Sequence, residues 1–338
     1  MCKVTLLAVD LAKDVFQVAG FTRKQKVVFN KQIRRKNLLE FMVQQSPCEV
    51  VMEACYSSHY WARCFENMGH TVRLLPAQHV TPFVRGNKSD RNDTVAIAEA
   101  SRRANIIAVP IKSVARQDIQ CLHRMREQSV TRRTALMNQV RGLLSEYGVV
   151  ASEGHKAFVR LLTEITDPQS ESVSAYLKVQ FRFMLEEYHQ LSERIAGIKK
   201  ELTLVVEREP QCQLMQSIPG IGVINSTALF SAIGNGQQFN SSREFAVWPG
   251  LTPRQSSSGN SFKSGGITKR GDRYLRKQLV HGARALLYRC KGRSDRLSNW
   301  ANALVARRGY NKAAVALAAR LARLCWTLLQ KNEMYKVK

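Results

Sequence analysis

The sequence predicts a chain of mixed class, an α/β amino-terminal part followed by mainly helical segments. Three observations predict it. Between residues 4 and 104, short β-branched runs alternate with helical segments, which is typical of an α/β domain. A heptad repeat of apolar residues then occupies residues 171–210. Beyond it, helical segments continue to the end of the chain and are interrupted by a Gly- and Ser-rich stretch.

The amino-terminal strands are indicated by apolar runs, two of which end at an acidic residue. The first, Val4–Asp10 (VTLLAVD), is continuous, as in a strand buried on both faces. Residues 48–54 (CEVVMEA) repeat this pattern and carry Glu53 near their end. Further strands are expected at residues 14–21, 26–30 and 71–76.

Helices are expected between and after these strands. Residues 37–45 and 58–68 have helical composition, and Ser57 or Ser58 could cap the second helix. Ser89 is a candidate N-cap for a helix over residues 89–104. A long, Arg-rich helix is expected over residues 114–147.

Residues 171–210 show the clearest periodicity. One apolar series recurs every seven residues, and a second lies four residues later in each heptad: Leu177, Met184, Leu191, Ile198 and Val205, then Phe181, Tyr188, Ile195 and Leu202. This pattern predicts a coiled coil or a long antiparallel helix pair. A helix packed within its own domain is the alternative. If the helix pairs with a second copy, the protein is a homodimer.

The last region begins near residue 211. Helices are expected at residues 223–233, 242–248, 272–290 and 313–331, with a Gly/Ser-rich loop over 249–266. The turn SIPGIG (217–222) resembles half of a helix-hairpin-helix, although a plain helix-to-helix turn explains it equally well. We therefore expect three parts: a catalytic domain at 1–148, a coiled-coil region at 149–210 and a helical domain at 211–338.

Charge is the strongest property of the composition. The chain has 52 Lys and Arg against 26 Asp and Glu, for a net charge of +26, and 44% hydrophobic residues exclude a disordered chain. Residues 251–338 alone hold 20 Lys and Arg against 3 Asp and Glu. A polyanionic partner is indicated, either nucleic acid or an acidic membrane surface. No apolar run predicts a membrane span or a signal peptide, and eight scattered cysteines without a CxxC motif are typical of reduced thiols in the cytoplasm.

Four carboxylates are the candidate metal ligands in this basic chain. Asp10 and Glu53 end two predicted strands, whereas Asp90 and Asp93 are separated by one helical turn and share a helix face. Clustered carboxylates raise one another's pKa unless cations neutralise them. Mg²⁺ prefers such oxygen ligands, and a pair of Mg²⁺ ions supports phosphoryl transfer. Alternatively, the acids merely favour the helix dipole or lie in ordinary loops.

Several motifs resemble one known family. They are AVDLAKD, VMEACYSSHYW and NKSDRNDTVAIAEA near the start, and SIPGIGVINSTALFSAIG with EFAVWPGLTPRQSSSGNSFKSGGITKRGDRYLRKQLVHGA near the end. Together they resemble the DEDD transposases, bacterial insertion-sequence recombinases related to pilin-gene invertases. The resemblance implies a RuvC-like catalytic domain of RNase H fold and a carboxy-terminal transposase domain. It assigns Asp10, Glu53, Asp90 and Asp93 to the DEDD positions, with Mg²⁺ as cofactor, and it implies a protein of the bacterial cytoplasm, associated with the nucleoid.

The same resemblance implies a serine nucleophile in a Ser-Gly step. Here that step is Ser258-Gly259, and Ser257 is the second candidate. Nearby cations would stabilise the developing charge on phosphate. The predicted nucleic-acid contacts are Arg254, Lys263, Lys269, Arg270, Arg273, Arg276 and Lys277. Without the resemblance, a polar loop that only contacts phosphate would be the better interpretation.

The resemblance also implies partners. They are donor and target DNA and a noncoding guide RNA encoded by the element, for which residues 32–37 (QIRRKN) and the Arg-rich helix are candidate contacts. We expect a homodimer, a possible tetramer on DNA, and a catalytic site that combines the acids with Ser258, shared between protomers if the coiled coil exchanges halves. Two other functions stay open: a metal-dependent nuclease of the Holliday-junction resolvase type, and a noncatalytic nucleic-acid-binding scaffold.

Overall fold

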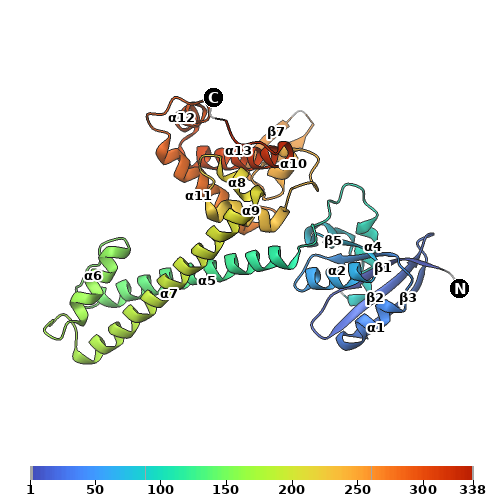
Figure 1. Cartoon of the computed structure of the whole chain (residues 1–338), viewed down its shortest axis with the longest axis horizontal. Helices are drawn as coiled ribbons and strands as arrows, with labels where there is room; N and C mark the ends of the chain where they lie inside the picture. Colours follow the sequence, from blue (N-terminus) through green and yellow to red (C-terminus); the bar gives the residue numbers. More distant parts are fainter. Residues whose placement is uncertain (1–2, 88, 260, 337–338) are drawn as a thin grey trace. The chain divides into compact units, whose positions relative to one another are not determined.

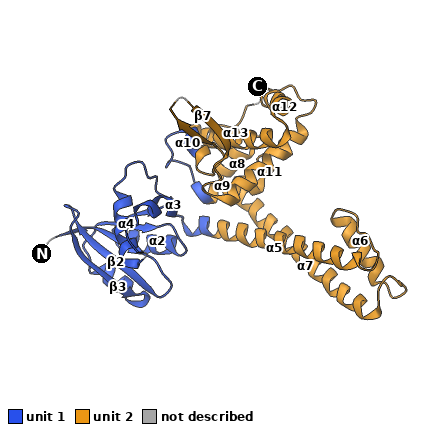
Figure 2. Ribbon diagram, turned by 180° about the vertical axis from the view of Figure 1, so that it is seen from behind, with its two compact units in different colours: residues 1–117, 232–245 blue, residues 118–231, 246–338 orange. Residues whose placement is uncertain are grey.

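A computed structural model describes residues 3–87, 89–259 and 261–336 of the chain (Figure 1). The chain divides into two compact units, residues 1–117 with 232–245, and residues 118–231 with 246–338 (Figure 2). Cys2, and Lys88 at the start of the KSDRND motif, lie outside the described residues.

The first unit is built on one mixed sheet of five strands. Its strands are β1 (Val4–Asp10), β2 (Val15–Thr22), β3 (Val27–Arg34), β4 (Glu49–Glu53) and β5 (Thr71–Leu75). Their spatial order is β3-β2-β1-β4-β5, with β1, β4 and β5 parallel and with β2 antiparallel to both β1 and β3. The central strand β1 therefore has neighbours on both sides, and β3 lies at an edge.

Helices cover both faces of this sheet. On one face, α1 (Leu38–Val43) and α2 (Ser58–Asn67) pack against Leu7 and Val9. On the other, α4 (Asp90–Ser101) packs against Leu6 and Ala8. Because both faces are buried, every residue from Leu6 to Val9 is apolar, which explains the continuous run in the sequence. The short α3 (Ala77–Val80) and the 3₁₀ turns Arg35–Asn37 and Thr81–Phe83 complete the connections.

Most predicted elements of this unit are confirmed, with two corrections. Strand β3 continues to Arg34, beyond the predicted end at residue 30, because Gln32 and Arg34 still pair with β2. Their polar side chains on an edge strand hid this extension. Neither serine caps α2 through its side chain: Ser57 has a left-handed φ of 64°, and Ser58 Oγ donates to the Cys55 carbonyl (2.8 Å).

The second unit contains a long helix pair. Helices α5 (Val114–Ser145) and α7 (Ala175–Arg208) run antiparallel (Figure 1). Arg133 of α5 donates to Ser192 of α7 (3.2 Å). Both helices share a core with α6 (His155–Thr166), which the sequence did not predict. Apolar heptad residues of α7, including Phe181 and Leu202, are buried within this chain. Pairing with a second copy stays a prediction.

The remaining helices form the carboxy-terminal part of the chain. They are α8 (Pro210–Gln216), α9 (Val223–Ile233), α10 (Ser242–Val247), α11 (Arg273–Arg289), α12 (Arg296–Arg308) and α13 (Tyr310–Lys331). Helix α12 was not predicted; it begins after Asp295, whose carboxylate accepts from the Leu297 and Ser298 amides. Of the described helices, only α13 is long and apolar enough to cross a membrane, yet its buried side packs on α8, α11 and α12.

The prediction of a Gly/Ser-rich loop over residues 249–266 is wrong. Most of it forms an antiparallel hairpin of β6 (Pro253–Ser258) and β7 (Ser261–Ile267). Gly259 at its tip has a φ of 54°, a left-handed conformation that glycine adopts without strain. The serines alternate between the two faces of strand β6, and all of them are exposed. Because the strand has no apolar face, the Gly- and Ser-rich composition of the segment gave no sign of it.

Candidate active site

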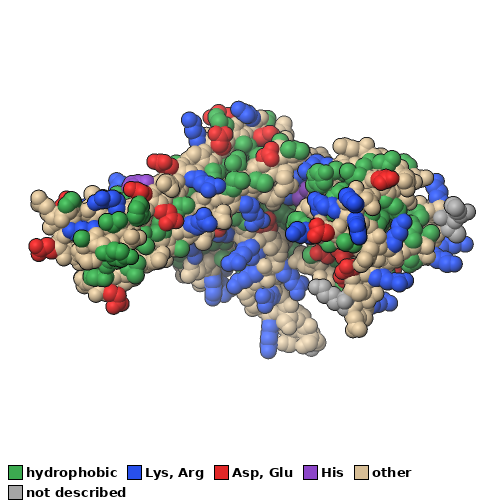
Figure 3. All heavy atoms as spheres, turned by 90° about the horizontal axis from the view of Figure 1, so that it is seen from below, with side chains coloured by type: hydrophobic (Ala, Val, Ile, Leu, Met, Phe, Trp, Pro, Cys, Tyr) green, Lys and Arg blue, Asp and Glu red, His purple; other side chains and the backbone are tan. Residues whose placement is uncertain are grey.

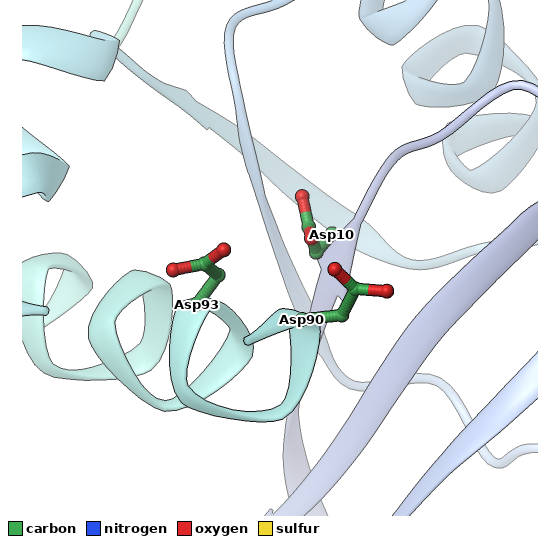
Figure 4. Close-up of side chains that lie close together, drawn as sticks. All are labelled: Asp10, Asp90 and Asp93. Carbon is green, nitrogen blue, oxygen red and sulfur yellow. The ribbon is translucent and has the colours of Figure 1, made fainter. Parts of the chain in front are cut away.

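Three carboxylates meet at one end of the central strand. Asp10 is the last residue of β1, and Asp90 and Asp93 lie on the first turn of α4. Figure 4 shows all three side chains directed toward a common space. One carboxylate oxygen from each lies within 4.8 Å of the others. The sequence-based expectation that the strand end and the DxxD helix converge is therefore confirmed for these three acids.

The start of α4 is fixed by local hydrogen bonds. Ser89 Oγ accepts from the Asn92 amide (3.3 Å), as the N-cap prediction required. Asn92 Nδ2 in turn donates to the carbonyl of Asn87 (2.8 Å). With the helix start held in place, Asp90 and Asp93 fall on the face that looks at β1.

Glu53 lies beside this cluster without being one of the three closest acids. It ends β4, the parallel neighbour of β1, and Val9 pairs with Met52, so Asp10 and Glu53 follow at the same level of the sheet. Burial and the nearby charge of Asp93 both raise the pKa of Glu53. Glu53 thus belongs to the same electrostatic site and could serve as a more distant ligand.

The electrostatics of the cluster favour a bound cation. Burial and, to a lesser degree, the charges of Asp93, Asp90 and Glu53 together raise the pKa of Asp10 to about 6. Each deprotonated acid thus raises the free energy of its neighbours' charged forms. A hard divalent cation would remove this repulsion, and carboxylate oxygens are the ligands that Mg²⁺ prefers. The donor set fits a Mg²⁺-type ion, because it contains oxygens and no thiolate or imidazole.

The β6–β7 hairpin separates the two candidate serines by face. Residues directly opposite each other share a face, and Ser256 pairs with Lys263 whereas Ser257 pairs with Phe262. Ser258 alternates to the Ser256 and Lys263 side. Ser258 therefore lies on the face that carries a cation, and Ser257 lies on the face that carries an exposed aromatic ring.

The predicted phosphate-binding residues have unequal surroundings. Arg276 donates to the carbonyls of Pro249 (2.8 Å) and Arg270 (3.5 Å), and Lys277 forms an ion pair with Glu127. These two side chains are thus engaged inside the chain. Arg254 and Arg270 line a hollow of about 590 Å³ at the base of the hairpin. Lys263, Lys269 and Arg273 are exposed. Lys and Arg side chains are spread over the whole face shown in Figure 3.

Sequence reasoning missed a polar network beside the acids. Gln17 Nε2 donates to Asn30 Oδ1 (2.5 Å), and Asn30 Nδ2 donates to Thr94 Oγ1 and to the carbonyl of Arg91 (both 3.1 Å). Strands β2 and β3 are thereby tied to the first turns of α4. A possible signal was the amide Gln17 inside the apolar strand VFQVAGF.

Comparison with known proteins finds transposases along the whole chain. Residues 7–149 match the DEDD transposase model of IS110, and residues 212–299 match the transposase IS116/IS110/IS902 family. A probable family 20 transposase of Pseudomonas aeruginosa is 41% identical over 98% of both chains. The transposase for insertion sequence element IS1111A of Coxiella burnetii is 40% identical over 99% of this chain and 92% of its own. The pilin gene-inverting protein of Moraxella lacunata is 22% identical over 81% of this chain and 80% of its own.

Proposed function

Since the chain belongs to the IS116/IS110/IS902 family of transposases, we propose that it cuts and exchanges DNA strands with a metal-bound acidic cluster and a serine nucleophile. As a transposase of an insertion sequence, it is an enzyme that cleaves DNA and transfers strands. The three carboxylates gathered within 4.8 Å of one another, in a chain of net charge +26, are the observation that carries the proposal.

Asp10, Asp90, Asp93 and Glu53 are the proposed metal ligands. The DEDD family implies a divalent metal, and the hard oxygen donors favour Mg²⁺. Bound Mg²⁺ ions, two in the proposed site, would neutralise the acids and stabilise charge on the reacting phosphate. The sheet order β3-β2-β1-β4-β5, with the acids where β1, β4 and α4 meet, supports a RuvC-like RNase H fold for this unit.

Ser258 is the proposed nucleophile. Its Oγ attacks the phosphorus, its proton passes to solvent, and the phosphodiester P–O bond to the leaving strand breaks. The leaving oxygen takes up a proton, and the DNA stays linked to the protein as a phosphoserine ester. Attack by the hydroxyl of another strand reverses these steps, so strands are exchanged without ATP. Lys263 on the same face of the hairpin supports Ser258 over Ser257, because a cation stabilises the charge that develops on phosphate.

DNA is the substrate, and a guide RNA is a proposed second partner. A strongly basic chain without a recognisable base-reading motif fits a protein that takes its sequence information from base pairing. Residues 32–37 and the Arg-rich helix α5 are proposed RNA contacts. Arg254, Lys263, Lys269, Arg270 and Arg273 are proposed to bind phosphate, with Arg276 and Lys277 contributing only if DNA displaces their internal partners.

We propose that the three segments divide the work. Residues 1–148 carry the acids, 149–210 join two protomers through α7, and 211–338 present Ser258 and most of the phosphate contacts. A homodimer, or two such dimers on DNA, would then hold the strands that are exchanged. The proposed reaction requires Ser258 and the acids to act on the same phosphate. Since they belong to different units of the chain, both units must contribute to one catalytic site.

A covalent adduct tests the nucleophile. We would incubate the full chain with Mg²⁺, its element-encoded RNA and a nicked donor DNA that cannot religate, and then map the adduct by mass spectrometry. Phosphoserine at position 258 is expected. Ser258→Ala should lower adduct formation by at least about a hundredfold, the effect of losing a nucleophile.

Ser257→Ala is the matched control, since it removes the neighbouring hydroxyl from the opposite face of the hairpin. It should retain adduct formation within about threefold, the usual range for a surface change. If Ser258→Ala still cuts DNA in Mg²⁺ without any adduct, the protein is a hydrolytic nuclease of the Holliday-junction resolvase type and the serine mechanism is wrong.

A further inference from the structure

A polar hollow lies next to the acidic cluster in the first unit. Its volume is about 530 Å³, and its lining consists of Gln17, Asn30, Lys31, Gln32, Ser89, Asp90 and Arg91. We call it the amide groove, after its three side-chain amides. Among these described lining residues Asp90 is the only acid, and Asp90 also belongs to the proposed metal site. A ligand in the groove would therefore lie directly beside the metal.

Strand register places the groove in line with Asp10. Asp10 pairs with Gln17 across β1 and β2, and Gln17 pairs with Gln32 across β2 and β3. Because directly paired residues share a face of the sheet, these three side chains form one polar row. The row runs from the acids to the edge strand β3, on the face that α4 covers.

The groove is held in shape by hydrogen bonds between its two walls. Gln17 is only 6% exposed and donates to Asn30, and Asn30 bonds both Thr94 and the backbone of α4. These bonds fix the wall formed by β3 relative to the wall formed by α4. The wall therefore needs little reorganisation when a ligand binds, which favours affinity.

The outer part of the groove is open for recognition. Gln32 and Arg91 are exposed, and among the described residues no side-chain hydrogen bond from Gln32 is seen. Lys31 alternates to the opposite face of β3, where its Nζ lies 4.5 Å from the centre of the Phe41 ring. A side-chain amide donates to phosphate oxygens and accepts from base edges, and the flanking cation Arg91 favours an anionic ligand. This combination suits a polynucleotide backbone more than an apolar ligand.

We propose that the amide groove binds the DNA strand immediately next to the cleaved phosphodiester, with Gln32 donating to a backbone phosphate and Arg91 adding charge. This assignment rests on the proposed function, because it uses the acids to say where the DNA is cut. It gives Gln32 to DNA and leaves residues 33–37 of the same segment as the proposed RNA contacts. Gln17 and Asn30 are positioning residues in this site, and the strand leaves the groove over β3.

Photocrosslinking tests the contact. p-Benzoylphenylalanine would replace Gln32 in the full chain, and a labelled single-stranded DNA would be irradiated with it in EDTA. Position 25, at the turn between β2 and β3, is the matched control, because Gln25 is exposed on the same hairpin and does not line the groove. DNA should crosslink at position 32 and not at position 25.

Binding affinity gives a second readout. Gln32→Glu replaces the donor with a carboxylate that repels phosphate, and it should weaken DNA binding about tenfold, the effect of losing one charge-assisted hydrogen bond. Gln25→Glu makes the same change of charge and should alter affinity less than twofold. Equal effects of the two substitutions, equal crosslinking, or crosslinking at position 32 to RNA alone would overturn the proposal.

These readouts need neither metal nor cleavage, so they separate the groove from the proposed function. Asp93→Asn protein should lose DNA cleavage and still crosslink at position 32. If Asp93→Asn protein cuts DNA normally while position 32 still crosslinks, the metal site is wrong, and the groove binds DNA but not next to the cleaved phosphodiester. If cleavage depends on Asp93 and position 32 does not crosslink, only the groove is wrong.

Discussion

Asp10 is the side chain whose pKa is affected by all three of the other acids of the site. It is half-buried at the end of β1, and this burial, together with the charges of three nearby acids, raises its pKa to about 6. At neutral pH Asp10 is therefore mostly charged, and without a cation this charge lowers the stability of the folded protein. A bound metal would reverse this, because the same oxygens would then coordinate a positive charge. The charge of Asp10, which destabilises the metal-free protein, is thus the charge that a bound metal would stabilise.

Replacing Asp10 with Asn should stabilise the metal-free protein. The folded pKa of about 6 exceeds the ordinary value of 3.8, so the folded state binds more protons between these values and loses stability as pH rises through them. At pH 7.5 the full penalty applies, and Asp10→Asn should raise the free energy of unfolding by about 1–2 kcal/mol, allowing for solvent screening. Near pH 4 this advantage should largely disappear.

Thermal melts in EDTA at pH 4.5 and 7.5 check this expectation. Added Mg²⁺ should then raise the melting temperature of the unsubstituted protein and leave that of Asp10→Asn nearly unchanged. If Asp10→Asn melts lower than the unsubstituted protein at pH 7.5 in EDTA, the repulsion inferred for the cluster is wrong.

At the same scale, the acids were predictable and the amides were not. Asp10, Asp90 and Asp93 follow from rules of local structure, since strand ends and a helical i, i+3 pair place them without knowledge of the fold. The positions of Gln17 and Gln32 beside the site depend on strand register, because they line up with Asp10 only once β1, β2 and β3 are paired. A sequence read along one strand does not contain that information.

At the level of elements, the turn SIPGIG is buried against helix α11. Gly220 has a φ of 91°, and its backbone faces Gly282 of α11 so closely that a Cβ on Gly282 would overlap the Gly220 carbonyl. Asn225 Nδ2 donates to the same carbonyl (3.2 Å). The glycines thus serve close packing between the α8–α9 turn and α11, which accounts for the motif without a phosphate.

Adding one methyl group at Gly282 should therefore be costly. Gly282→Ala should lower the free energy of unfolding by about 1–3 kcal/mol, since backbone atoms of the turn would have to move. Gly197→Ala in α7 is the matched control, because a Cβ at Gly197 meets nothing within 4 Å. It should stabilise the protein by about 0.5–1 kcal/mol through its higher helix propensity. Denaturant unfolding of both variants measures these free energies. Equal changes in the two variants would contradict the close packing inferred at Gly282.

Strand β1 and helix α7 were predicted from their hydrophobic periodicity, whereas the β6–β7 hairpin of small polar residues was not. Helix α6 was also missed, although Phe158, Leu162 and Ile165 recur in it at helical spacing. Strand β1 and helix α7 bury regular apolar series, so their existence follows from sequence alone. The β6–β7 hairpin buries nothing along β6, and its pairing depends on backbone hydrogen bonds and a tight turn. Ser-Gly-Asn-Ser is compatible with both a loop and a two-residue turn, so composition alone favoured the loop.

For the whole molecule, the separation of chemical groups along the chain is the main feature. The acids lie in the unit of residues 1–117 and 232–245, and Ser258 lies in the other unit, with most of the carboxy-terminal positive charge. Such a separation allows the two groups to come from different protomers of a dimer. Whether they do depends on which protomer supplies the serine, and mixed dimers can answer this.

Two engineered heterodimers should give opposite results. In the first, one protomer carries Asp10→Ala and its partner carries Ser258→Ala. If sites are shared between protomers, one of the two sites in this dimer has intact acids and an intact serine, and it should form the covalent DNA adduct. If each site comes from one protomer, both sites are defective and no adduct should form.

The second heterodimer pairs an unsubstituted protomer with one that carries both substitutions. It contains the same two changes, so differences in stability or DNA affinity cancel between the two preparations. Here, sharing leaves both sites defective, whereas sites within one protomer leave one site intact. We expect adduct from the first heterodimer and none from the second, after purification through two different affinity tags. The reverse pattern would show that acids and serine act within one protomer, and adduct from both heterodimers would show that Asp10 or Ser258 is not required for the reaction.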